Sequence, residues 1–211
     1  MKVLVTGGSR GIGKSIVDIF KLHDHEVYYP TSKELNLLDP INLIHRDFDI
    51  VINCAGINPI KSIQDITDNN VMRINYTAPF EIIQQCLPYM IEKKYGRIIN
   101  IGSIWIDLAK AGRAAYSASK SALHSLTKSL TAEYAKYNIL TNTVSPGYIA
   151  TDLTYKNNTL DELNLIISKI PIGRLGKPNE VANLVYQLTI QNTMITGQNI
   201  NIDGGFLCTT I

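Results

Sequence analysis

The stretch Lys2-Val-Leu-Val-Thr-Gly-Gly-Ser-Arg-Gly-Ile-Gly13 predicts a buried strand, a glycine-rich turn and the first residues of a helix. Its three spaced glycines let the backbone turn sharply and approach a pyrophosphate, and the N-terminus of the following helix offers free N–H groups. The spacing is G-x-x-x-G-x-G rather than G-x-G-x-x-G, so the prediction of nucleotide binding depends on the strand–turn–helix context. That context favours nucleotide binding over a glycine turn without function.

Strands and helices are predicted to alternate along the chain, as in α/β folds with a parallel sheet. The predicted strands are Lys2–Val5, Glu26–Tyr29, Glu34–Leu37, Asp49–Asn53, Arg97–Ile101, Leu140–Val144 and Asn199–Ile202. The predicted helices are Ile12–Leu22, Asn69–Lys93 with interruptions at Pro79 and Pro88, Arg113–Tyr137, Leu160–Lys169 and Asn179–Thr189. Because no linker, repeat or composition break divides the chain, we expect one Rossmann-type, doubly wound domain over residues 1–211.

The connection between the second and third predicted strands is unusually short. Only Pro30-Thr-Ser-Lys33 separates them, whereas a parallel crossover normally needs a dozen residues or more, usually including a helix. Either the second strand bends directly into the third segment or the crossover helix has been deleted. The following stretch, Asp39–Asp47, has room only for a short helix.

Bulk composition argues against several classes of partner. The formal net charge of +2 gives no electrostatic reason to expect nucleic acid or an acidic membrane surface. The three scattered cysteines predict neither a disulfide framework nor a zinc site, and the four histidines predict no metal site. We expect no signal peptide and no transmembrane segment, and reduced thiols favour a cytoplasmic location.

A candidate catalytic pair lies in Arg113-Ala-Ala-Tyr-Ser-Ala-Ser-Lys120. The i, i+4 spacing places Tyr116 and Lys120 on one face of a helix. A free tyrosine has a pKa of about 10, and a neighbouring ammonium is expected to lower that pKa towards neutrality. Ser103 follows a predicted strand, where its hydroxyl can face the same site. Because Tyr-x-x-x-Lys is also a common accident, the prediction rests on its order relative to the other motifs.

Three further segments give weaker signals. The small residues of Asn53-Cys-Ala-Gly56 at a strand end can let a ligand lie against the backbone, although a plain strand-ending turn is the alternative. Asn75, if buried in its helix, needs partners, and a water or a main-chain carbonyl near the site would serve. Pro146-Gly147 predicts a turn, after which the Ile149 backbone and the Thr151 hydroxyl can reach a carboxamide or a phosphate.

Taken together, these motifs resemble the short-chain dehydrogenase/reductase family in their order and spacing, over almost the whole chain. The likeness is closest to the 3-oxoacyl-(acyl-carrier-protein) reductase branch, as the segments Ile172–Ala182, Ile195–Gln198 and Ile202–Gly205 also indicate. The resemblance implies that Tyr116 protonates a carbonyl oxygen, that Lys120 lowers its pKa and binds the nicotinamide ribose, that Ser103 polarises the carbonyl, and that Asn75 maintains a water-linked proton path.

Two departures from that family bear on function. Cys54 replaces the usual second asparagine of Asn-Asn-Ala-Gly, which removes one side-chain hydrogen bond. The missing crossover helix trims the adenine side of the cofactor pocket. Its compact replacement, Ser32–Asp39, is similar to a segment of nucleotide-sugar reductases, although the long C-terminal substrate region of those enzymes is absent from this sequence.

We expect the cofactor to be NADP, with NAD as the alternative. The hydroxyls of Thr31 and Ser32 and the cation Arg10 suit a 2′-phosphate, whereas Glu34 suits a ribose hydroxyl. The residues expected to bind the cofactor are Gly7, Ser9, Arg10, Gly11, Ile12, Gly13, Thr31, Ser32, Asn36, Leu37, Asn53, Ala55, Gly56, Tyr116, Lys120, Pro146, Gly147, Ile149 and Thr151.

The expected substrate is a small-molecule ketone or a 3-oxoacyl thioester, with a nucleotide sugar or another polar ketone as the alternative. A dinucleotide-binding regulator without turnover is less favoured, because tyrosine, lysine and serine are all present. A hydrolase built on Ser103 is disfavoured, because the G-x-S-x-G elbow is missing. The resemblance also implies a dimer or tetramer, paired through the two long helices and with the tail Phe206–Ile211 buried against a neighbour.

Overall fold

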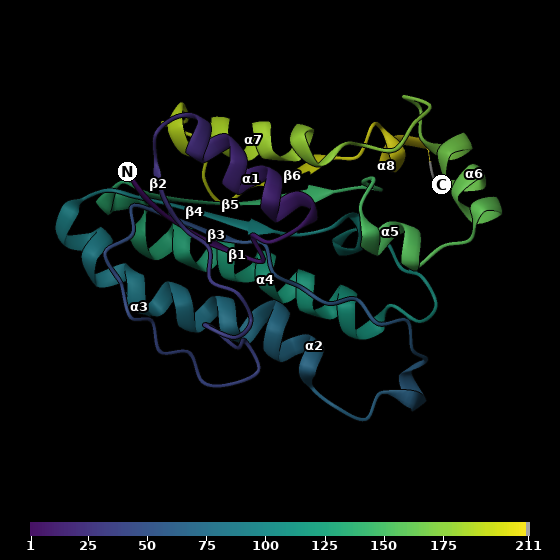
Figure 1. Ribbon diagram of the computed structural model, residues 1–211, viewed down its shortest axis with the longest axis horizontal. Helices are drawn as coiled ribbons and strands as arrows, with labels where there is room; N and C mark the ends of the chain where they lie inside the picture. The colour runs from purple at the N-terminus through teal and green to yellow at the C-terminus, as the bar shows by residue number, and fades with distance from the viewer. Residues whose placement is uncertain (210–211) are drawn as a thin grey trace.

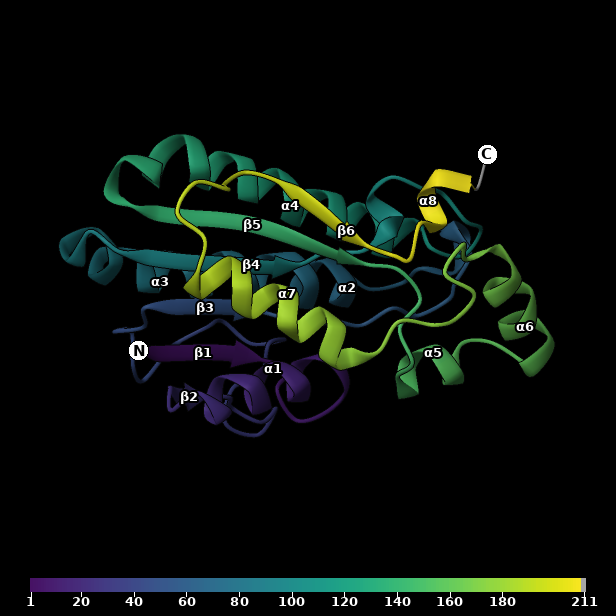
Figure 2. The same ribbon diagram turned by 90° about the horizontal axis from the view of Figure 1, so that it is seen from above.

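In the computed structural model, which describes residues 1–209, six parallel strands form one sheet in the order β2-β1-β3-β4-β5-β6 (Figures 1 and 2). The strands are β1 (Lys2–Thr6), β2 (Glu26–Tyr28), β3 (Ile50–Asn53), β4 (Gly96–Ile101), β5 (Ile139–Pro146) and β6 (Asn199–Ile202). The strand order reverses between β1 and β3, so the carboxyl ends of these two strands flank a crevice of the kind in which open α/β sheets bind ligands. A Rossmann-type parallel sheet was predicted, and it is present.

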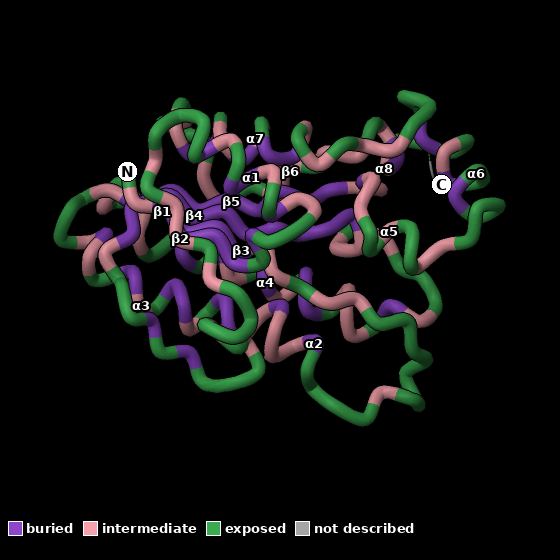
Figure 3. Tube along the Cα trace, viewed as in Figure 1, coloured by how far each residue is buried: buried purple, intermediate pink, exposed green. Residues whose placement is uncertain are grey.

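Helices cover both faces of the sheet. Helices α1 (Gly11–Leu22) and α7 (Pro178–Ile190) lie on one face, and α3 (Ala78–Lys93) and α4 (Ala114–Tyr134) lie on the other (Figure 1). Each face has its own apolar cluster, and the buried segments in Figure 3 converge on the strands between them. Because both faces are covered, β3, β4 and β5 are buried along their whole length.

Shorter elements occupy the loops, and most of them lie near the carboxyl edge of the sheet. They are η1 (Ile63–Asp65), α2 (Asn70–Met72), η2 (Arg73–Thr77), η3 (Ile104–Ile106), η4 (Ala135–Tyr137), α5 (Asp152–Lys156), α6 (Leu160–Lys169) and α8 (Phe206–Thr209). None of the helices within residues 1–209 combines the length and apolar character needed to cross a membrane.

The predicted strand Glu34–Leu37 is wrong, and residues 39–47 form no helix. The segment forms turns instead, because Asn36 accepts a hydrogen bond from Leu38 N (3.2 Å) and donates one to Asp39 Oδ2 (2.8 Å). Such local side-chain bonds compete with strand pairing. Within the described chain the crossover helix is therefore absent, and a loop runs from β2 to β3 with Leu35 and Leu37 packed against the cluster beneath α3.

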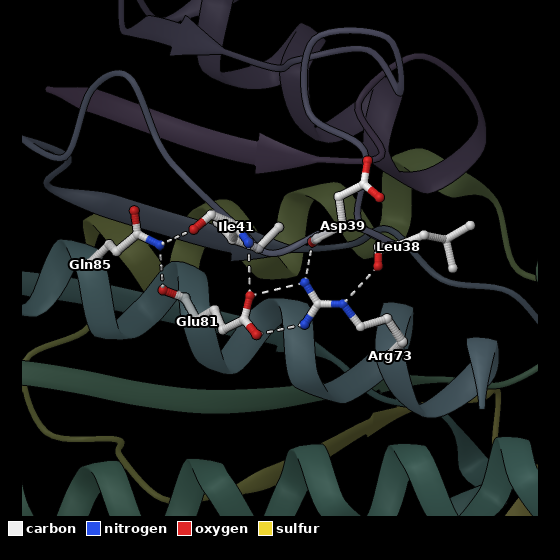
Figure 4. Close-up of polar contacts among 6 residues, drawn as sticks. All are labelled: Leu38, Asp39, Ile41, Arg73, Glu81 and Gln85. Carbon is white, nitrogen blue, oxygen red and sulfur yellow. Dashed lines mark hydrogen bonds and ion pairs between the residues drawn. The ribbon is translucent and has the colours of Figure 1, made fainter.

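This loop is fixed to the helices by a set of polar contacts that we call the loop clamp, made by Arg73, Glu81 and Gln85 (Figure 4). Arg73 pairs with both carboxylate oxygens of Glu81 (2.7 and 2.9 Å) and donates to the carbonyls of Leu38 and Asp39. Glu81 also accepts from Ile41 N at 2.9 Å. Further along the loop, the Gln85 side chain donates to Ile41 O and accepts from Leu43 N. Side-chain hydrogen bonds thus hold this loop in place, as backbone hydrogen bonds would hold a strand in a sheet.

The loop clamp predicts an acid-labile contribution to stability. Hydrogen bonds from Arg73 lower the pKa of Glu81 below its ordinary value of 4.5. A lowered folded pKa means that this stabilisation is present above pH 4.5 and is lost as the pH falls through the folded pKa. We expect Glu81→Gln to lower the unfolding free energy at pH 7 by about 1–2 kcal/mol, with a smaller loss at pH 3.5.

Urea unfolding of wild type and Glu81→Gln at the two pH values measures this difference. Glu180→Gln is the control, because Glu180 forms a similar two-point pair with Arg174 on the exposed surface. An equal loss at both pH values, or a loss no larger than that of Glu180→Gln, would contradict the role given to the loop clamp.

The predicted helix Asn69–Lys93 is present without the expected interruptions at its prolines. Pro79 lies in the first turn of α3, directly after the π-helical turn η2, where a missing N–H costs little; Pro88 lies inside α3. The predicted helix Arg113–Tyr137 consists of α4 followed by the 3₁₀ turn η4.

The described part of the tail packs at Phe206 against its own chain, and its burial against a neighbouring subunit stays a prediction. Phe206 is buried within its own chain, edge-on to Tyr148 with ring centroids 5.3 Å apart, and in one apolar cluster with Ile104, Ile166 and Ile170. Its ring therefore needs no neighbouring subunit to leave water. Thr210 and Ile211, which were included in the expected buried tail, lie outside the described residues.

Candidate active site

The glycine-rich turn forms a tight cradle between β1 and α1. Gly7 and Gly11 adopt positive φ angles of 69° and 54°, which L side chains rarely adopt. A Cβ on Gly13 would lie 2.1 Å from the carbonyl oxygen of Gly7, and a Cβ on Gly7 would lie 2.8 Å from Ala55 Cα. Glycine at these positions lets the backbone of the turn pack against the segment after β3, at the point where the strand order reverses.

The predicted segment that runs from Pro146 to Thr151 reaches this cradle through Thr151. Thr151, the residue before α5, lies over the turn, because a Cβ on Gly11 would be 3.5 Å from its Cγ2. Gly147 follows β5, donates its N–H to Ile202 O (3.0 Å) and leaves no room for a Cβ beside Asp203. Ile149 bridges to Gly176, which fixes the loop that carries Thr151.

The segment Asn53–Gly56 is held from β1. The Thr6 hydroxyl oxygen accepts hydrogen bonds from Cys54 N (3.1 Å) and Ala55 N (3.2 Å). The Asn53 side chain donates to Asn100 Oδ1 at 2.9 Å, deep in the sheet. Gly56 lies beside two candidate residues, since a Cβ there would be 3.2 Å from Asn75 Oδ1 and 3.5 Å from Lys120 Nζ.

Asn75 is fully buried in the π-helical turn η2, a local widening that often marks functional sites. Its amide oxygen accepts from Ile57 N (2.9 Å), and its amide nitrogen donates to Ile57 O and Ser119 Oγ (both 3.0 Å). A water or a main-chain carbonyl was expected as the partner of Asn75, and the carbonyl of Ile57 fills this role. Asn75 thereby joins the segment after β3 to helix α4.

Ser103 lies between β4 and η3, directly before the first residue of η3. It is buried, and its hydroxyl oxygen accepts from Trp105 N at 3.3 Å. Tyr116 lies half-buried on α4 and is influenced by that hydroxyl, because a hydrogen bond to Ser103 lowers the pKa of Tyr116. Ser103 and Tyr116 therefore lie close to each other and line the same cavity.

The net shift of Tyr116 is opposite to the sequence-based expectation. Burial raises the pKa of Tyr116 above 10, and the Ser103 hydroxyl and the Arg113 charge only partly offset this effect. The Lys120 Nζ lies 5.7 Å from the centre of the Tyr116 ring and donates to Ile101 O at 2.6 Å. A lowering of the Tyr116 pKa by Lys120 stays a prediction. Desolvation, which the sequence does not display, decides the direction.

Lys120 itself is almost completely buried at the end of β4. Burial lowers the pKa of its ammonium to about 8, while a smaller effect of Cys54 raises it. Cys54, which replaces the usual asparagine, has its thiol pKa raised to about 11 by burial, so it stays neutral at pH 7. The Lys120 ammonium is therefore mostly charged at pH 7 and loses its proton at about pH 8.

These residues line one cavity of about 130 Å³ at the carboxyl edge of the sheet. It is bounded by the first turn of α1, the segment after β3, the end of β4, the face of α4 and the start of the loop after β5. Its lining residues are Ile12, Cys54, Gly56, Ile57, Ile101, Gly102, Ser103, Tyr116, Lys120, Pro146 and Leu153. A phenol, an ammonium and a hydroxyl thus share a space that the glycine cradle adjoins.

Comparisons with known proteins agree with this arrangement. A family profile described as enoyl-(acyl carrier protein) reductase matches residues 35–207. The 3-oxoacyl-(acyl-carrier-protein) reductase of Vibrio cholerae serotype O1 is 32% identical over 233 aligned residues, which cover 96% of this chain and 95% of the relative. The chain belongs to the short-chain dehydrogenase/reductase family. It is an NAD(P)-dependent oxidoreductase.

Solved structures of this family share the fold over nearly the whole chain. A 4-hydroxyisoleucine dehydrogenase mutant complexed with NADH and succinate has a TM-score of 0.89 and 30% identity, with 100% of both chains covered. A candidate 2-deoxy-D-gluconate 3-dehydrogenase from Agrobacterium tumefaciens with bound NADP has a TM-score of 0.88 and 26% identity, covering 98% of this chain and 96% of the other.

The cofactor end of this dehydrogenase/reductase differs in detail from the sequence-based picture. Glu34 accepts hydrogen bonds from both the N–H (2.8 Å) and the hydroxyl (2.9 Å) of Thr31, and these bonds lower the pKa of Glu34. The Thr31 hydroxyl is therefore already engaged. Arg10, directly before α1, and Ser32 are exposed. Asn36 is engaged with Asp39, and Leu37 is half-buried.

Sequence reasoning missed four residues that shape the site. Gly8 has no room for a Cβ, which would meet Tyr29 and Val17 at 2.7 and 2.8 Å. Thr6 organises the segment after β3, and Ser119 anchors Asn75. Arg113, which sequence analysis treated only as the beginning of a helix, is buried one turn before Tyr116. Its i−3 spacing from Tyr116 was the available signal.

Proposed function

We propose that this protein reduces a ketone to a secondary alcohol, and catalyses the reverse oxidation, with NADP(H) and through Ser103, Tyr116, Lys120 and Asn75. The observation that carries the proposal is the shared cavity. Ser103, Tyr116 and Lys120 line it together with Ile12 of the glycine cradle, so an acid–base group and a cofactor cradle face one small space.

The residues of the crevice fit a dinucleotide. Gly7, Gly11 and Gly13 keep the cradle free of side chains, and the first N–H groups of α1 point out of the helix end beside it. The segment after β3 can lie flat against a ligand, because Ala55 and Gly56 are small. When bound, the nicotinamide supplies or accepts the hydride.

The roles of the protein side chains follow from their positions. The Ser103 hydroxyl donates a hydrogen bond to the substrate carbonyl oxygen and orients it towards Tyr116. The Tyr116 phenol gives its proton to that oxygen during reduction and removes it during oxidation. A raised pKa keeps Tyr116 protonated at neutral pH, which suits the reductive direction. The Lys120 ammonium holds ribose hydroxyls and adds positive charge beside the oxygen that becomes negative.

We assign Asn75 a positioning role. Its amide bonds Ile57 on one side and Ser119 on the other, so it fixes both the segment after β3 and the helix that carries Tyr116. Within the π-helical turn, the Asn75 amide points towards the site, while Arg73, two residues earlier, pairs with Glu81 in the loop clamp. A proton path through water bound near Asn75 remains our proposal from the family resemblance.

Relatives guide the choice of substrate. The reductase from Vibrio cholerae acts by its name on a 3-oxoacyl group, and the structural neighbours act by their names on hydroxylated acids. We propose a 3-oxoacyl skeleton, as in a 3-oxoacyl thioester, with a nucleotide sugar or another polar ketone as the alternative. A screen of NADPH oxidation over acyl thioesters, sugar nucleotides and simple ketones tests the proposal, and no oxidation with any of them would contradict it.

Cofactor preference provides a separate prediction. We expect NADPH to bind about tenfold more tightly than NADH, because Arg10 and the Ser32 hydroxyl can hold a 2′-phosphate. Arg10→Gln should remove this preference and leave NADH binding unchanged. Fluorescence titration with both cofactors measures it, with Lys14→Gln as a control, because Lys14 is an exposed α1 cation already paired with Asp18.

Glu34 is the opposing feature in this prediction. Its lowered pKa keeps a negative charge in the loop after β2, where that charge disfavours a phosphate. Equal affinities, or tighter binding of NADH by the wild type, would show that Glu34 rather than Arg10 sets the preference.

A further inference from the structure

Arg113 is a buried cation whose donors are largely unused. The residue is only 6% exposed, and burial lowers the pKa of its guanidinium. Its one side-chain hydrogen bond within the described chain is a long one, from Nη1 to Asn58 O at 3.5 Å. Its Nε is buried with no partner, and no carboxylate of residues 1–209 pairs with it. A buried charge without a counter-ion is costly, so a reason for it is needed.

The other buried arginine on this sheet shows what a structural role looks like. Arg97 donates from Nη1 to the carbonyls of Gly96 (2.8 Å) and Asn138 (2.9 Å), reaches Asn192 O with Nη2, and stacks on Tyr95. Backbone carbonyls and an aromatic ring therefore stabilise that guanidinium. Arg113 is equally buried, but among the described residues it has only one long hydrogen bond to a backbone carbonyl and no cation–π contact. The Nε of both arginines has no partner there.

Arg113 is also placed on the catalytic face of α4. It directly precedes the helix, and the spacings i, i+3 and i+7 align Arg113, Tyr116 and Lys120 in one stripe. Its charge lowers the pKa of both Tyr116 and Tyr148, so it lies within electrostatic reach of the phenol and of the loop after β5. Along this stripe, Arg113 lies beyond Tyr116 on the side away from Lys120.

Two more unpartnered polar atoms belong to residues that are hydrogen-bonded to Arg113. Asn58 Oδ1 belongs to the residue whose carbonyl accepts from Arg113, and Ser117 Oγ lies one turn further along the same face of α4. Neither has a hydrogen-bond partner among the described residues. Buried polar groups are normally satisfied, so the unpartnered Nε of Arg113 indicates a polar ligand, and two residues hydrogen-bonded to Arg113 carry further unused polar atoms.

We propose that Arg113 binds a carboxylate of the substrate, and that the preferred substrate is a short oxo acid, or its hydroxy acid, with the carboxylate one or two carbons from the reacting carbonyl. Successive Cα atoms along a helix rise about 1.5 Å, so Arg113 begins about 4.5 Å from Tyr116 along α4, close to the separation of the two groups in such an acid. A planar guanidinium fork matches a carboxylate. The cavity of about 130 Å³ is lined by Tyr116 and not by Arg113, so it suits a short molecule whose carboxylate extends beyond the cavity towards Arg113.

This inference rests on the proposed function and narrows it. A 3-oxoacyl thioester shares the 3-oxo skeleton but presents a neutral carbonyl to Arg113. A free 3-oxo acid or 2-oxo acid carries a carboxylate that can serve as the missing counter-ion of the buried guanidinium. The structure therefore favours the free acid over the thioester.

The test compares matched charged and neutral substrates. Initial rates of NADPH oxidation are measured with 2-oxobutanoate, 3-oxobutanoate and the methyl ester of each. We expect the wild type to prefer at least one acid over its ester by about 10- to 100-fold in kcat/KM, the range for hydrogen bonds to a charged group. Arg113→Gln should abolish this ratio, and Arg113→Lys should restore part of it. Lys110→Gln, which removes an exposed cation from the same loop, should leave the ratio unchanged.

The acid-to-ester ratio separates binding from other effects of Arg113. Loss of its charge also raises the pKa of Tyr116 and affects both substrates alike, so only the ratio reports on the carboxylate. Equal rates with acids and esters in the wild type would overturn the proposal. An equal loss with acid and ester in Arg113→Gln would reduce Arg113 to a structural role and also overturn it.

A binding measurement keeps this inference apart from the proposed function. Calorimetric titration of 3-oxobutanoate and 2-oxobutanoate into the protein saturated with NADP⁺ cannot lead to reduction and reports affinity alone. Binding of at least one acid by the wild type, weakened about tenfold or more in Arg113→Gln, would support the carboxylate site even if NADPH oxidation failed. Turnover of thioesters combined with no binding of either acid would sustain the proposed function and refute the role of Arg113.

Discussion

Replacing Tyr116 by phenylalanine is expected to lower the rate of hydride transfer by about 10²- to 10⁴-fold, the range that a positioned acid–base group contributes. The phenol lines the shared cavity beside Ser103 and stays protonated at neutral pH, because burial raises its pKa. Removing one oxygen leaves the ring and its packing on α4. The measurement is single-turnover oxidation of NADPH with a ketone that the wild type accepts.

Cofactor binding provides the control for this change. The affinity for NADPH should stay within about threefold of wild type, because a lost neutral hydrogen bond costs little free energy. Tyr148→Phe is the matched variant: Tyr148 is another half-buried tyrosine, in the loop after β5, packed edge-on against Trp105. A near-normal rate in Tyr116→Phe, or an equal loss in Tyr148→Phe, would rule out Tyr116 as the acid.

The second large effect is expected for Lys120→Met. The ammonium donates to Ile101 O at 2.6 Å and lies in the same cavity as Tyr116, so its removal takes away the positive charge beside the reacting oxygen. We expect kcat/KM to fall by about 10²-fold or more, in the range seen when one stabilising donor is removed from an active site.

The pH dependence distinguishes the charge of Lys120 from its packing. Burial lowers its pKa to about 8, so the ammonium is charged below that pH and neutral above it. The wild-type kcat/KM for ketone reduction should therefore decline as the pH rises through about 8, whereas the low activity of Lys120→Met should lack this decline. A profile for Lys120→Met that is parallel to wild type would contradict the role of the charge.

The sequence predicted those parts of the site that depend on spacing and local order. The i, i+4 relation of Tyr116 and Lys120 and the glycine turn after β1 are properties of neighbouring residues, and the parallel sheet brings Ser103 to the same edge. The direction of the Tyr116 pKa shift was not predictable, because it depends on burial by segments far apart in sequence.

Segments under tertiary control account for the remaining differences. The stretch Glu34–Leu37 has the apolar alternation of a strand, but the Asn36 turn and the loop clamp of Arg73 and Glu81 fix it as a loop. The π-helical turn around Asn75 has no local sequence signal, and the spacing of Arg113 from Tyr116 does not reveal that Arg113 is buried without a counter-ion. Arg113 becomes informative only when its missing counter-ion is visible.

Transfer of deuterium from the cofactor to the substrate tests the central claim most directly. The protein is incubated with NADPH carrying deuterium at the transferable position of C4, together with an accepted ketone, and the alcohol is analysed by mass spectrometry and NMR. We predict one deuterium on the carbinol carbon with wild type and a strongly reduced yield in the same time with Tyr116→Phe. Tight binding of NADPH without deuterium in any product from oxo acids, esters, thioesters or sugar nucleotides would contradict the account and identify a protein that binds the cofactor without using it.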